Sequence, residues 1–438
     1  MGRLRKVVRI GAVAAASLAI SMATVLPAVA NPATSIAYPN GSTNTRYVGK
    51  AFDACTAPSL ATIQKWSASP YRALGVYVGG NSRTCTQPNL TAAWVTAVTK
   101  MGWRLIPIYK GAQPTCGGRV TDPKIIPSTA AAQGKASADD MIGKANALGM
   151  VAGSGFYLDI EAYSRTDATC RTAVLTFESA WTKQLHARGY LSGLYLNLLN
   201  GAADTAAVYN STTYTRPDAI WVARYDLSTS LTNWTGIPNS YWAVHQRAKQ
   251  YRGSHDETYG GATLNIDNDY FDAPVATVRY SYKVTSTVPL NARTGPSTTY
   301  PVVRQYSSGS SLSVLCQTTG QTISTTSVWD RLSDGSYVSD YYVSTPSSTG
   351  FSAPLPRCNY GYQISGASSV NLRSGPGTTY PIVGTIPEGG LAAVTCQKSG
   401  ALVLTTRIWD RLDNGKWVSD YYVVNPSNTT YSGPAQRC

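Results

Sequence analysis

The C-terminal part of the chain is an internal duplication without a gap. NARTGPSTTYPVV at 291 returns as NLRSGPGTTYPIV at 371, an offset of 371 − 291 = 80 residues, and SVWDRLSDGSYVSDYYV returns as RIWDRLDNGKWVSDYYV at the same offset. Trp329 thus corresponds to Trp409. Self-similarity at a fixed period marks repeated structural units. One core does not usually organise 438 residues, and we predict two small homologous domains at 281–358 and 361–438.

Each duplicated unit has the pattern of a small all-β barrel. Short runs rich in Val, Thr and Tyr alternate with Gly-Pro, Asp-Gly and Asn-Gly turn signals, and no stretch keeps a helical period. Cys316 and Cys358 lie 42 residues apart, as do Cys396 and Cys438. Because a small β fold with a limited core gains stability from covalent closure, we predict one disulfide in each unit.

The second copy resembles the bacterial SH3 domain. VNLRSGPGTTYPIVGTIPEGG follows that family's N-x-R-x-G-P…Y-x-x-x-G pattern closely, and the first copy, with Asn291 and Arg293, follows it more loosely. The resemblance implies binding to peptide or glycan parts of a bacterial cell wall. For the individual residues we prefer a structural interpretation, in which the motif builds a turn and Trp329 and Trp409 are core. Two tandem copies would still lengthen residence on a polymer.

The first thirty residues predict a signal peptide. A basic start with Arg3, Arg5, Lys6 and Arg9 precedes an apolar stretch, and Ala28-Val29-Ala30 gives the small-x-small cleavage pattern. We expect a secreted protein that begins at Asn31, and no membrane anchor after the signal at 1–30 is removed, since no later apolar run could span a bilayer.

The charge of the mature chain favours an anionic partner. Removing the signal leaves 33 − 23 = +10 charges, which suits either nucleic acid or an anionic cell envelope. Export favours the envelope, and no nucleic-acid motif is present. The expected partner is therefore cell-wall peptidoglycan or a related glycan, and not nucleic acid; we expect a monomer.

The other four cysteines, Cys55, Cys85, Cys116 and Cys170, also indicate disulfides, since no C-x-x-C pair suggests a metal site. They allow three pairings. We favour Cys55 with Cys85 and Cys116 with Cys170.

Residues 45–275 have the rhythm of βα units, in which short apolar runs alternate with longer Ala-rich segments. Helices are expected at 58–69, 87–102, 128–148 and 172–188. Strands are expected at 47–53, 73–79, 104–110, 155–161, 190–197, 219–226, 241–246 and 264–269. Eight strands in this length predict a (β/α)₈ TIM barrel. A doubly wound open sheet is the alternative, but no Gly-rich phosphate loop follows the first strand.

One strand ends in two acids two residues apart, in GFYLDIEAY at 155–163. Side chains alternate along a strand, so Asp159 and Glu161 point the same way, and in this fold that is toward the mouth, where active sites lie. Glycosidic cleavage needs an acid that protonates the leaving oxygen and a carboxylate that stabilises positive charge at the sugar carbon. The other candidates at strand ends are Asp53, Tyr77, Tyr109, Asn197, Arg224, Asp226, His245, Gln246, Asp267 and Asn268.

This set resembles glycoside hydrolase family 25, the lysozyme-like muramidases, through FDAC, FYLDIE, WVARYD, HQ and NIDND. The overall arrangement is most similar to a secreted actinobacterial glycoside-hydrolase-like barrel. Carried over by position, Glu161 is the general acid, Asp159 orients the substrate's acetamido group, which could itself act as nucleophile, and Asp53 and Asp267 hold the sugar. The expected seventh strand departs from the muramidase pattern. It reads AVHQRA, whereas the family has an aromatic residue and Gln, followed by Tyr, at this place.

Three other interpretations stay open. The acids could be structural; His245 could belong to the core; and the barrel could be a wall-binding scaffold without activity. No cofactor is expected, and three His residues without an H-x-x-x-H spacing argue against a zinc site.

Overall fold

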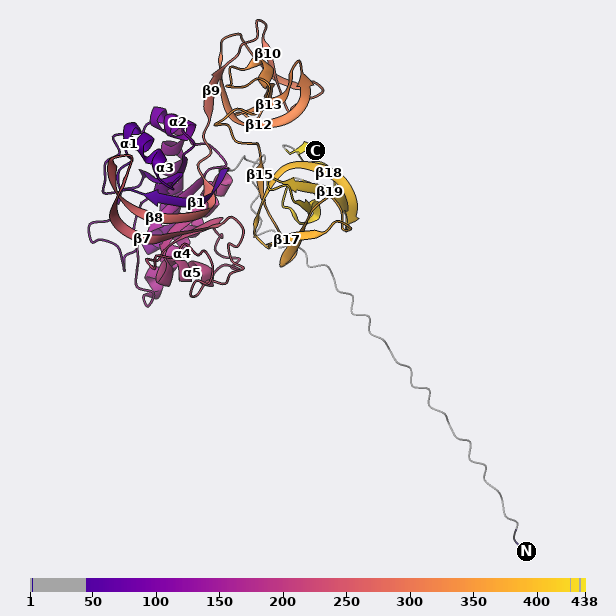
Figure 1. Ribbon diagram of the computed structural model, residues 1–438. Helices are drawn as coiled ribbons and strands as arrows, with labels where there is room; N and C mark the ends of the chain where they lie inside the picture. Colours follow the sequence, from indigo (N-terminus) through magenta and orange to yellow (C-terminus); the bar gives the residue numbers. More distant parts are fainter. Residues whose placement is uncertain (1, 3–44, 426, 433–434) are drawn as a thin grey trace.

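The computed structural model describes residue 2 and residues 45–425, 427–432 and 435–438. The predicted signal peptide lies outside the described residues, except for residue 2. In Figure 1 the barrel runs from indigo to salmon, the first repeat is orange and the second repeat is yellow.

Eight strands form the predicted closed barrel, each paired with the next along the chain and the last with the first. Strands β1 to β7 are parallel to one another, whereas β8 is antiparallel to both β7 and β1. The prediction of eight strands closed into a barrel is confirmed, and the alternative of an open sheet is excluded. The parallel direction that a TIM barrel predicts for every strand is wrong for the last strand. The strands are β1 (Thr45–Asp53), β2 (Ala73–Gly79), β3 (Arg104–Tyr109), β4 (Gly155–Ile160), β5 (Leu191–Asn197), β6 (Ala219–Ala223), β7 (Arg247–Tyr259) and β8 (Ala262–Val275).

The helical layer is thinner than in a complete βα barrel. Side-chain oxygens of Ser59, Thr91 and Asp167 cap three of the helices at their N-termini. No α-helix occurs after α5: residues 208–246, which include β6, contain none, and β7 is joined to β8 without one. The helices are α1 (Leu60–Lys65), α2 (Ala92–Lys100), α3 (Ala130–Ala147), α4 (Ala168–Ala187) and α5 (Ala203–Ala207).

The seventh strand is not where the sequence predicted it. Trp242 and His245 have positive φ angles of 47° and 54°, which a strand does not allow, and the segment 241–246 is a turn. The strand β7 begins at Arg247 and forms a long hairpin with β8 through Gly260 and Gly261, both at positive φ. The hairpin reaches the outer layer, where the Trp66 indole donates to the carbonyl of Ala262 (2.9 Å). It takes the place of a missing helix.

Aromatic rings fill the barrel below its mouth. Tyr157, Trp221 and Phe271 are fully buried and meet edge to face, with ring centroids 5.0–5.8 Å apart. Gly193 leaves room for this packing, because a Cβ there would lie 2.3 Å from the Tyr157 ring. Polar chemistry is therefore confined to the layer above these rings.

The two repeats have the same strand order. In each repeat, mostly antiparallel strands curl into a half-barrel (Figure 1). The four disulfides Cys55–Cys85, Cys116–Cys170, Cys316–Cys358 and Cys396–Cys438 confirm the predicted pairings. The first repeat contains β9 (Tyr280–Lys283), β10 (Leu290–Arg293), β11 (Val302–Tyr306), β12 (Ser311–Ile323), β13 (Thr326–Leu332) and β14 (Tyr337–Ser339). The second contains β15 (Tyr360–Gln363), β16 (Ser369–Arg373), β17 (Ile382–Pro387), β18 (Leu391–Val403), β19 (Thr406–Leu412), β20 (Trp417–Ser419) and β21 (Gln436–Arg437).

The second repeat packs against the N-terminal end of the barrel strands. Arg46, at the start of β1, forms an ion pair with Asp413 (2.6 Å). Leu191, at the start of β5, shares an apolar cluster with Tyr360 and Tyr362. The repeats are thus kept away from the end of the barrel where the strands terminate. Among the helices of the described residues, none has both the length and the apolar composition needed to cross a membrane.

Each repeat buries a pair of Asp residues around one Gln. In the second repeat, Gln397 Nε2 donates to Asp410 (2.8 Å) and Asp420 (2.9 Å), while its Oε1 accepts from the backbone N–H of Ser432 (2.6 Å). Burial, and then the neighbouring Asp420, raise the pKa of Asp410 well above its ordinary value. The Asp residues of the WDR and SDY motifs are therefore structural.

We expect Asp410→Asn to flatten the pH dependence of stability. The pKa of Asp410 is raised in the folded state, so its stabilising contribution is present at low pH and declines as pH rises above about 4, the ordinary Asp pKa. Urea unfolding at pH 5 and pH 8 should show a smaller difference between the two pH values for Asp410→Asn than for the unsubstituted chain. An unchanged difference would contradict the assignment; exposed Asp256→Asn is the control.

Candidate active site at the barrel mouth

The polar side chains converge where the strands end. Asp53 ends β1, and its register partner on β8 is Asp267. Tyr77 on β2, Lys110 after β3, and these two acids line a cavity of about 120 Å³ that is open to solvent. Because the apolar rings close the barrel below, this cavity is the accessible part of the barrel interior.

Lys110 bridges the two acids of the DIE motif. Its Nζ lies 3.3 Å from Asp159 Oδ2 and in direct contact with Glu161 Oε1. The Asp159 side chain is only 6% exposed, whereas that of Glu161 is 46% exposed. Two carboxylates on one strand face thus have different environments, one inside the barrel and one at the rim.

The backbone of the DIE motif is held by Gln113. Its Nε2 donates to the carbonyl of Asp159 (2.9 Å), and its Oε1 accepts from the N–H of Glu161 (2.8 Å). Gln113 is fully buried. Such paired bonds fix the strand end and thereby the direction of both carboxylates.

The other wall of the site is a group of acids around Gln250. Gln250 Nε2 donates to Asp53 (2.8 Å) and Asp267 (3.1 Å). One layer deeper, Asp269 is fully buried and accepts from the Trp221 indole (3.0 Å). Three acids within one small volume are stable only when protons are shared among them.

Burial sets the protonation of these acids. It raises the pKa of Asp159 to about 6, an effect that the Lys110 ammonium opposes. Burial, and then the charge of Asp267, raise the pKa of Asp53, and the pKa of Asp267 itself rises to about 6 through burial. The mouth therefore holds carboxyl groups that titrate within the range in which general acid and base catalysis operates.

Tyrosines surround the carboxylates. Tyr195 stacks on Trp221 with ring centroids 4.2 Å apart, and burial followed by the charges of nearby acids raises the pKa of Tyr77. Tyr225 follows β6 with an exposed ring. Flat rings next to acids can pack against the apolar faces of sugars.

Three of the predicted site residues lie elsewhere. Tyr109 points outward, because it alternates with Lys110, and its hydroxyl donates to Asp140 on α3 (2.9 Å). His245 and Gln246 precede β7 at the opposite end of the barrel, where His245 Nδ1 contacts Asp272 (2.5 Å) and Gln246 Nε2 donates to the carbonyl of Asp218 (2.7 Å). These side chains cannot reach the mouth.

The remaining predicted residues are near the rim but already engaged. Arg224 Nε donates to Asp226 (2.8 Å), and Asp226 also pairs with Lys249, which alternates with Gln250 and so leaves the barrel on its outer side. Asn197 accepts from the N–H of Leu199 (3.0 Å) at the end of β5. Asp53, Asp159, Glu161, Asp267 and Tyr77 thus form the centre, and the other three lie at its edge.

Sequence reasoning missed Lys110, Gln113, Gln250 and Asp269. Strand alternation places Lys110 on the face of Ile106 and Ile108, inside the barrel, and could have revealed it. Gln250 was missed because the seventh strand was placed too early in the chain.

No metal site accompanies this group in the part of the chain that the structure describes. The one cluster of potential ligands there is Cys116, Asp167 and Cys170, and its two sulfurs form a disulfide.

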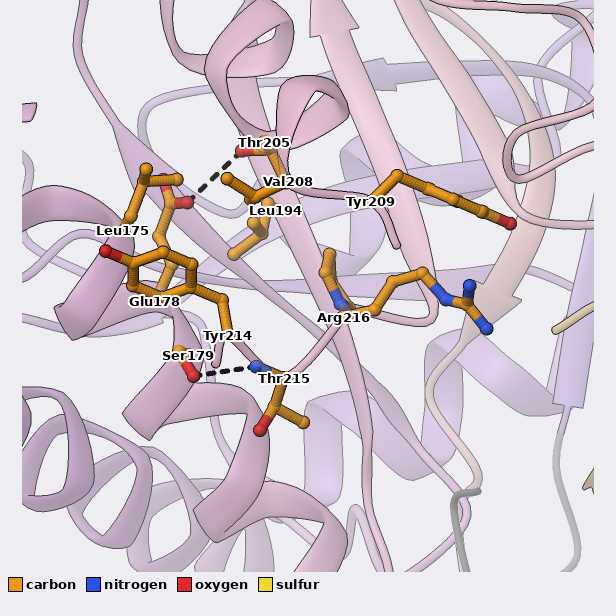
Figure 2. Close-up of a pocket in the computed structure, with 11 residues that line it drawn as sticks. Leu175, Glu178, Ser179, Leu194, Thr205, Val208, Tyr209, Tyr214, Thr215 and Arg216 are labelled. Carbon is orange, nitrogen blue, oxygen red and sulfur yellow. Dashed lines mark hydrogen bonds between the residues drawn. The ribbon is translucent and has the colours of Figure 1, made fainter. Parts of the chain in front are cut away.

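A second cavity lies in the helical layer and surrounds Glu178 (Figure 2). Its volume of about 10 Å³ is enough for one water. Thr205 donates to Glu178 Oε2 (3.2 Å), and Oε1 has no partner among the described residues. Burial raises the pKa of Glu178 to about 8. A cavity of this size is too small for a substrate, and burial favours the neutral form of Glu178.

Glu178→Gln should stabilise the protein at alkaline pH. The folded pKa of about 8 exceeds the ordinary value, so the contribution of Glu178 to stability is lost as pH rises from about 4.5 to about 8. The neutral amide has no such loss, and at pH 8.5 the free energy of unfolding should rise by on the order of 5 kcal/mol. Thermal unfolding at pH 5 and 8.5 measures this, with exposed Glu388→Gln as control. Equal effects at both pH values would refute the assignment.

A protein-family model matches the barrel. Residues 64–271, from α1 into β8, match the family described as "Rv2525c-like, glycoside hydrolase-like domain". The spore cortex lytic enzyme SleM of Clostridium perfringens is 12% identical, with a TM-score of 0.36, over 88% of this chain and 96% of SleM.

Two proteins of Bacillus subtilis (strain 168) match a shorter segment. They are the uncharacterized proteins YraJ, 38% identical over 76 residues, and YraI, 37% identical over 81 residues. The matches take in 15% and 16% of this chain, and the chain covers 64% of YraJ and 68% of YraI. Over the segment shared with YraI the chain belongs to the family of that protein, and its barrel is similar to the Rv2525c-like glycoside hydrolase-like domain.

Proposed function

We propose that the protein is a secreted glycoside hydrolase that cleaves peptidoglycan or a related N-acetylated glycan, and that its two repeats, SH3-like modules, hold it on the cell wall. The observation that carries the proposal is the pair Asp159 and Glu161 at the barrel mouth, one carboxyl buried and the other exposed, opposite Asp53 and Asp267. The match of residues 64–271 to a glycoside hydrolase-like family supports it.

The exposed position of Glu161 suits a proton donor. A substrate in the mouth can bring its glycosidic oxygen to this carboxyl, which gives its proton to that oxygen as the bond to the anomeric carbon breaks. The acetamido oxygen of the same sugar attacks the anomeric carbon, and water later opens the resulting ring. Glu161 then takes a proton from that water, which restores the starting state.

Asp159 is placed to stabilise positive charge. Its carboxylate lies below Glu161 on the same strand face and is buried, where it would accept a hydrogen bond from the acetamido N–H and stabilise the developing charge. Asp53 and Asp267, on the opposite wall, would hold the sugar hydroxyls, and Tyr77 would pack against the ring. Asn197, Arg224 and Asp226 remain proposed contacts at the rim.

The contact between Lys110 and Glu161 must open during turnover. Lys110 Nζ contacts Glu161 Oε1, and this oxygen must be free to meet the substrate's glycosidic oxygen. We propose that substrate enters between these side chains and leaves Lys110 paired with Asp159.

Several features support action at the cell wall. The four disulfides suit an extracellular protein. The net charge of +10 expected for the mature chain favours association with an anionic envelope. The repeats contact the end of the barrel opposite to the mouth, and a wall strand held by them would leave the mouth accessible.

Glu161→Gln should abolish cleavage and preserve wall binding. The amide has nearly the same size but cannot donate the proton, so the release of new reducing ends from purified peptidoglycan should fall by about a hundredfold or more. Pelleting with the wall should be unchanged, because the exposed Glu161 does not contact the repeats. Exposed Glu388→Gln is the matched control. Cleavage at the full rate by Glu161→Gln would exclude Glu161 as the acid.

Lys110→Met should shift the pH dependence of cleavage. Lys110 lowers the pKa of Asp159, which stands at about 6, so its removal should move the acid limb of the kcat/KM profile to higher pH, by about one pH unit. Lys110→Arg retains the charge and should keep the limb near its original position. A limb that does not move in Lys110→Met would show that Asp159 need not be ionised.

One observation favours a second candidate function. Lys110 pairs with both acids of the DIE motif, as expected of a barrel that binds wall glycan without cutting it. Binding to several purified walls without the release of any fragment would support this binding scaffold and contradict the hydrolase.

A further inference from the structure

One cation at the barrel mouth has no acid to pair with. Arg83 lines the mouth cavity together with Asp53 and Asp267, yet it forms no ion pair with any residue that the structure describes. Its Nη1 donates to the carbonyl of Tyr77 (3.0 Å), whereas its Nε and Nη2 have no partner in the described chain. The other cation of this lining, Lys110, already contacts both acids of the DIE motif. One edge of the Arg83 guanidinium is therefore available to a ligand in the cavity.

The loop that carries Arg83 is fixed against the end of β3. Ser82 is buried, and its N–H donates to the carbonyl of Lys110 (3.0 Å). Gly80 permits this close approach, because its φ is 100° and a Cβ there would lie 2.0 Å from the carbonyl oxygen of Lys110. At the other end of the loop, a disulfide ties Cys85 to the segment that follows β1. The loop thus holds Arg83 at a fixed place beside the cavity.

The free edge of Arg83 suits a carboxylate. The hydroxyl and acetamido groups of a neutral sugar can pair with carboxylates and amides, and neither requires a fixed positive charge. A guanidinium edge with free N–H groups on Nε and Nη2 matches the two oxygens of a planar carboxylate. Arg83 shares a cavity of about 120 Å³ with Asp53 and Asp267, the acids assigned to the sugar hydroxyls. A carboxylate carried by that same sugar would therefore lie in the cavity that Arg83 lines.

We propose that Arg83 binds a carboxylate on the sugar held by Asp53 and Asp267, so that the barrel selects glycan strands with free acid groups. This inference rests on the proposed hydrolase function. In peptidoglycan the acid is the lactyl group of muramic acid, which stands on the ring carbon next to the acetamido group. Where a peptide is attached, the lactyl group is an uncharged amide and cannot form an ion pair with Arg83. The selected strands are those from which the peptides have been removed.

This selectivity gives the barrel a place in a reaction sequence. An amidase has to act first. In its reaction, water cleaves the amide bond between the lactyl carbonyl and the first amino acid, which leaves a free carboxylate on the sugar and a free amine on the peptide. The barrel then acts on the strand that carries these carboxylates. Strands with intact peptides, and neutral chains of N-acetylglucosamine, lack the group that Arg83 binds.

Titration calorimetry on the chain carrying Glu161→Gln tests the proposal, because binding is measured without cleavage. The probes are a tetrasaccharide of alternating N-acetylglucosamine and N-acetylmuramic acid with free lactyl acids, the same tetrasaccharide with the acids converted to methylamides, and the same tetrasaccharide with its peptides attached. We expect both amide forms to bind at least about tenfold more weakly than the free acid. Equal binding of the free acid and the methylamide would overturn the proposal. Equal binding of the peptide-bearing form would also overturn it, because the carboxylate would then belong to the peptide.

Substitutions at position 83 locate the carboxylate. In the same Glu161→Gln background, Arg83→Gln should lose the preference for the free acid, and Arg83→Lys, which keeps the charge without the planar fork, should keep part of it. Arg171→Gln, at an exposed position on α4 outside the cavity, is the matched control and should keep the full preference. A structural role of Arg83 alone would weaken the binding of acid and methylamide equally. A full preference in Arg83→Gln, or its loss in Arg171→Gln, would contradict the assignment.

Cleavage by the chain with Glu161 intact separates this inference from the proposed hydrolase. We expect kcat/KM to be about tenfold higher for the free acid than for either amide form. A preference for the free acid in binding, without cleavage of any form, would contradict the hydrolase and support the assignment of Arg83. Cleavage of all three forms at equal rates would support the hydrolase and overturn the assignment.

Discussion

The antiparallel pairing of β8 with β1 is the constraint on which the site depends. It closes the barrel and sets Asp53 opposite Asp267 in register. The hairpin that delivers β8 also brings Gln250 between these two acids.

Burial of acids serves two different purposes in this chain. In each repeat, a Gln donates to both members of a buried Asp pair that no substrate can reach, and the same geometry occurs in both copies. In the barrel, Glu178 occupies a cavity the size of one water. Asp53 and Asp267 at the mouth also have raised pKa values, but they line a larger cavity together with Lys110, so these perturbed groups are accessible to a ligand. Access, and not protonation alone, distinguishes the candidate site.

Local patterns predicted most of the barrel and part of its site. The first six strands contain short apolar runs that the sequence analysis located. The pairing of the four disulfides followed from the cysteine spacing in the repeats and from the choice made for the barrel. Asp53, Asp159, Glu161 and Asp267 were found because they end or interrupt apolar runs. The segment 241–246 was predicted to be a strand because it contains apolar residues such as Trp242. Trp242 is indeed buried, but it lies in a turn and not in a strand. The Gly260-Gly261 signal for the hairpin was available in the sequence. The ion contacts of Lys110 depend on the strand order around the barrel, which no local pattern contains.

The most direct test of the central claim is a crystal structure of the Glu161→Gln chain with an N-acetylated tetrasaccharide from peptidoglycan. The account predicts that the saccharide crosses the barrel mouth, with a glycosidic oxygen within hydrogen-bond distance of the amide at position 161 and an acetamido group beside Asp159. It also predicts that Lys110 no longer contacts residue 161. A saccharide bound only to the repeats, or a mouth that stays closed by Lys110 at saturating ligand, would contradict a catalytic role for the barrel.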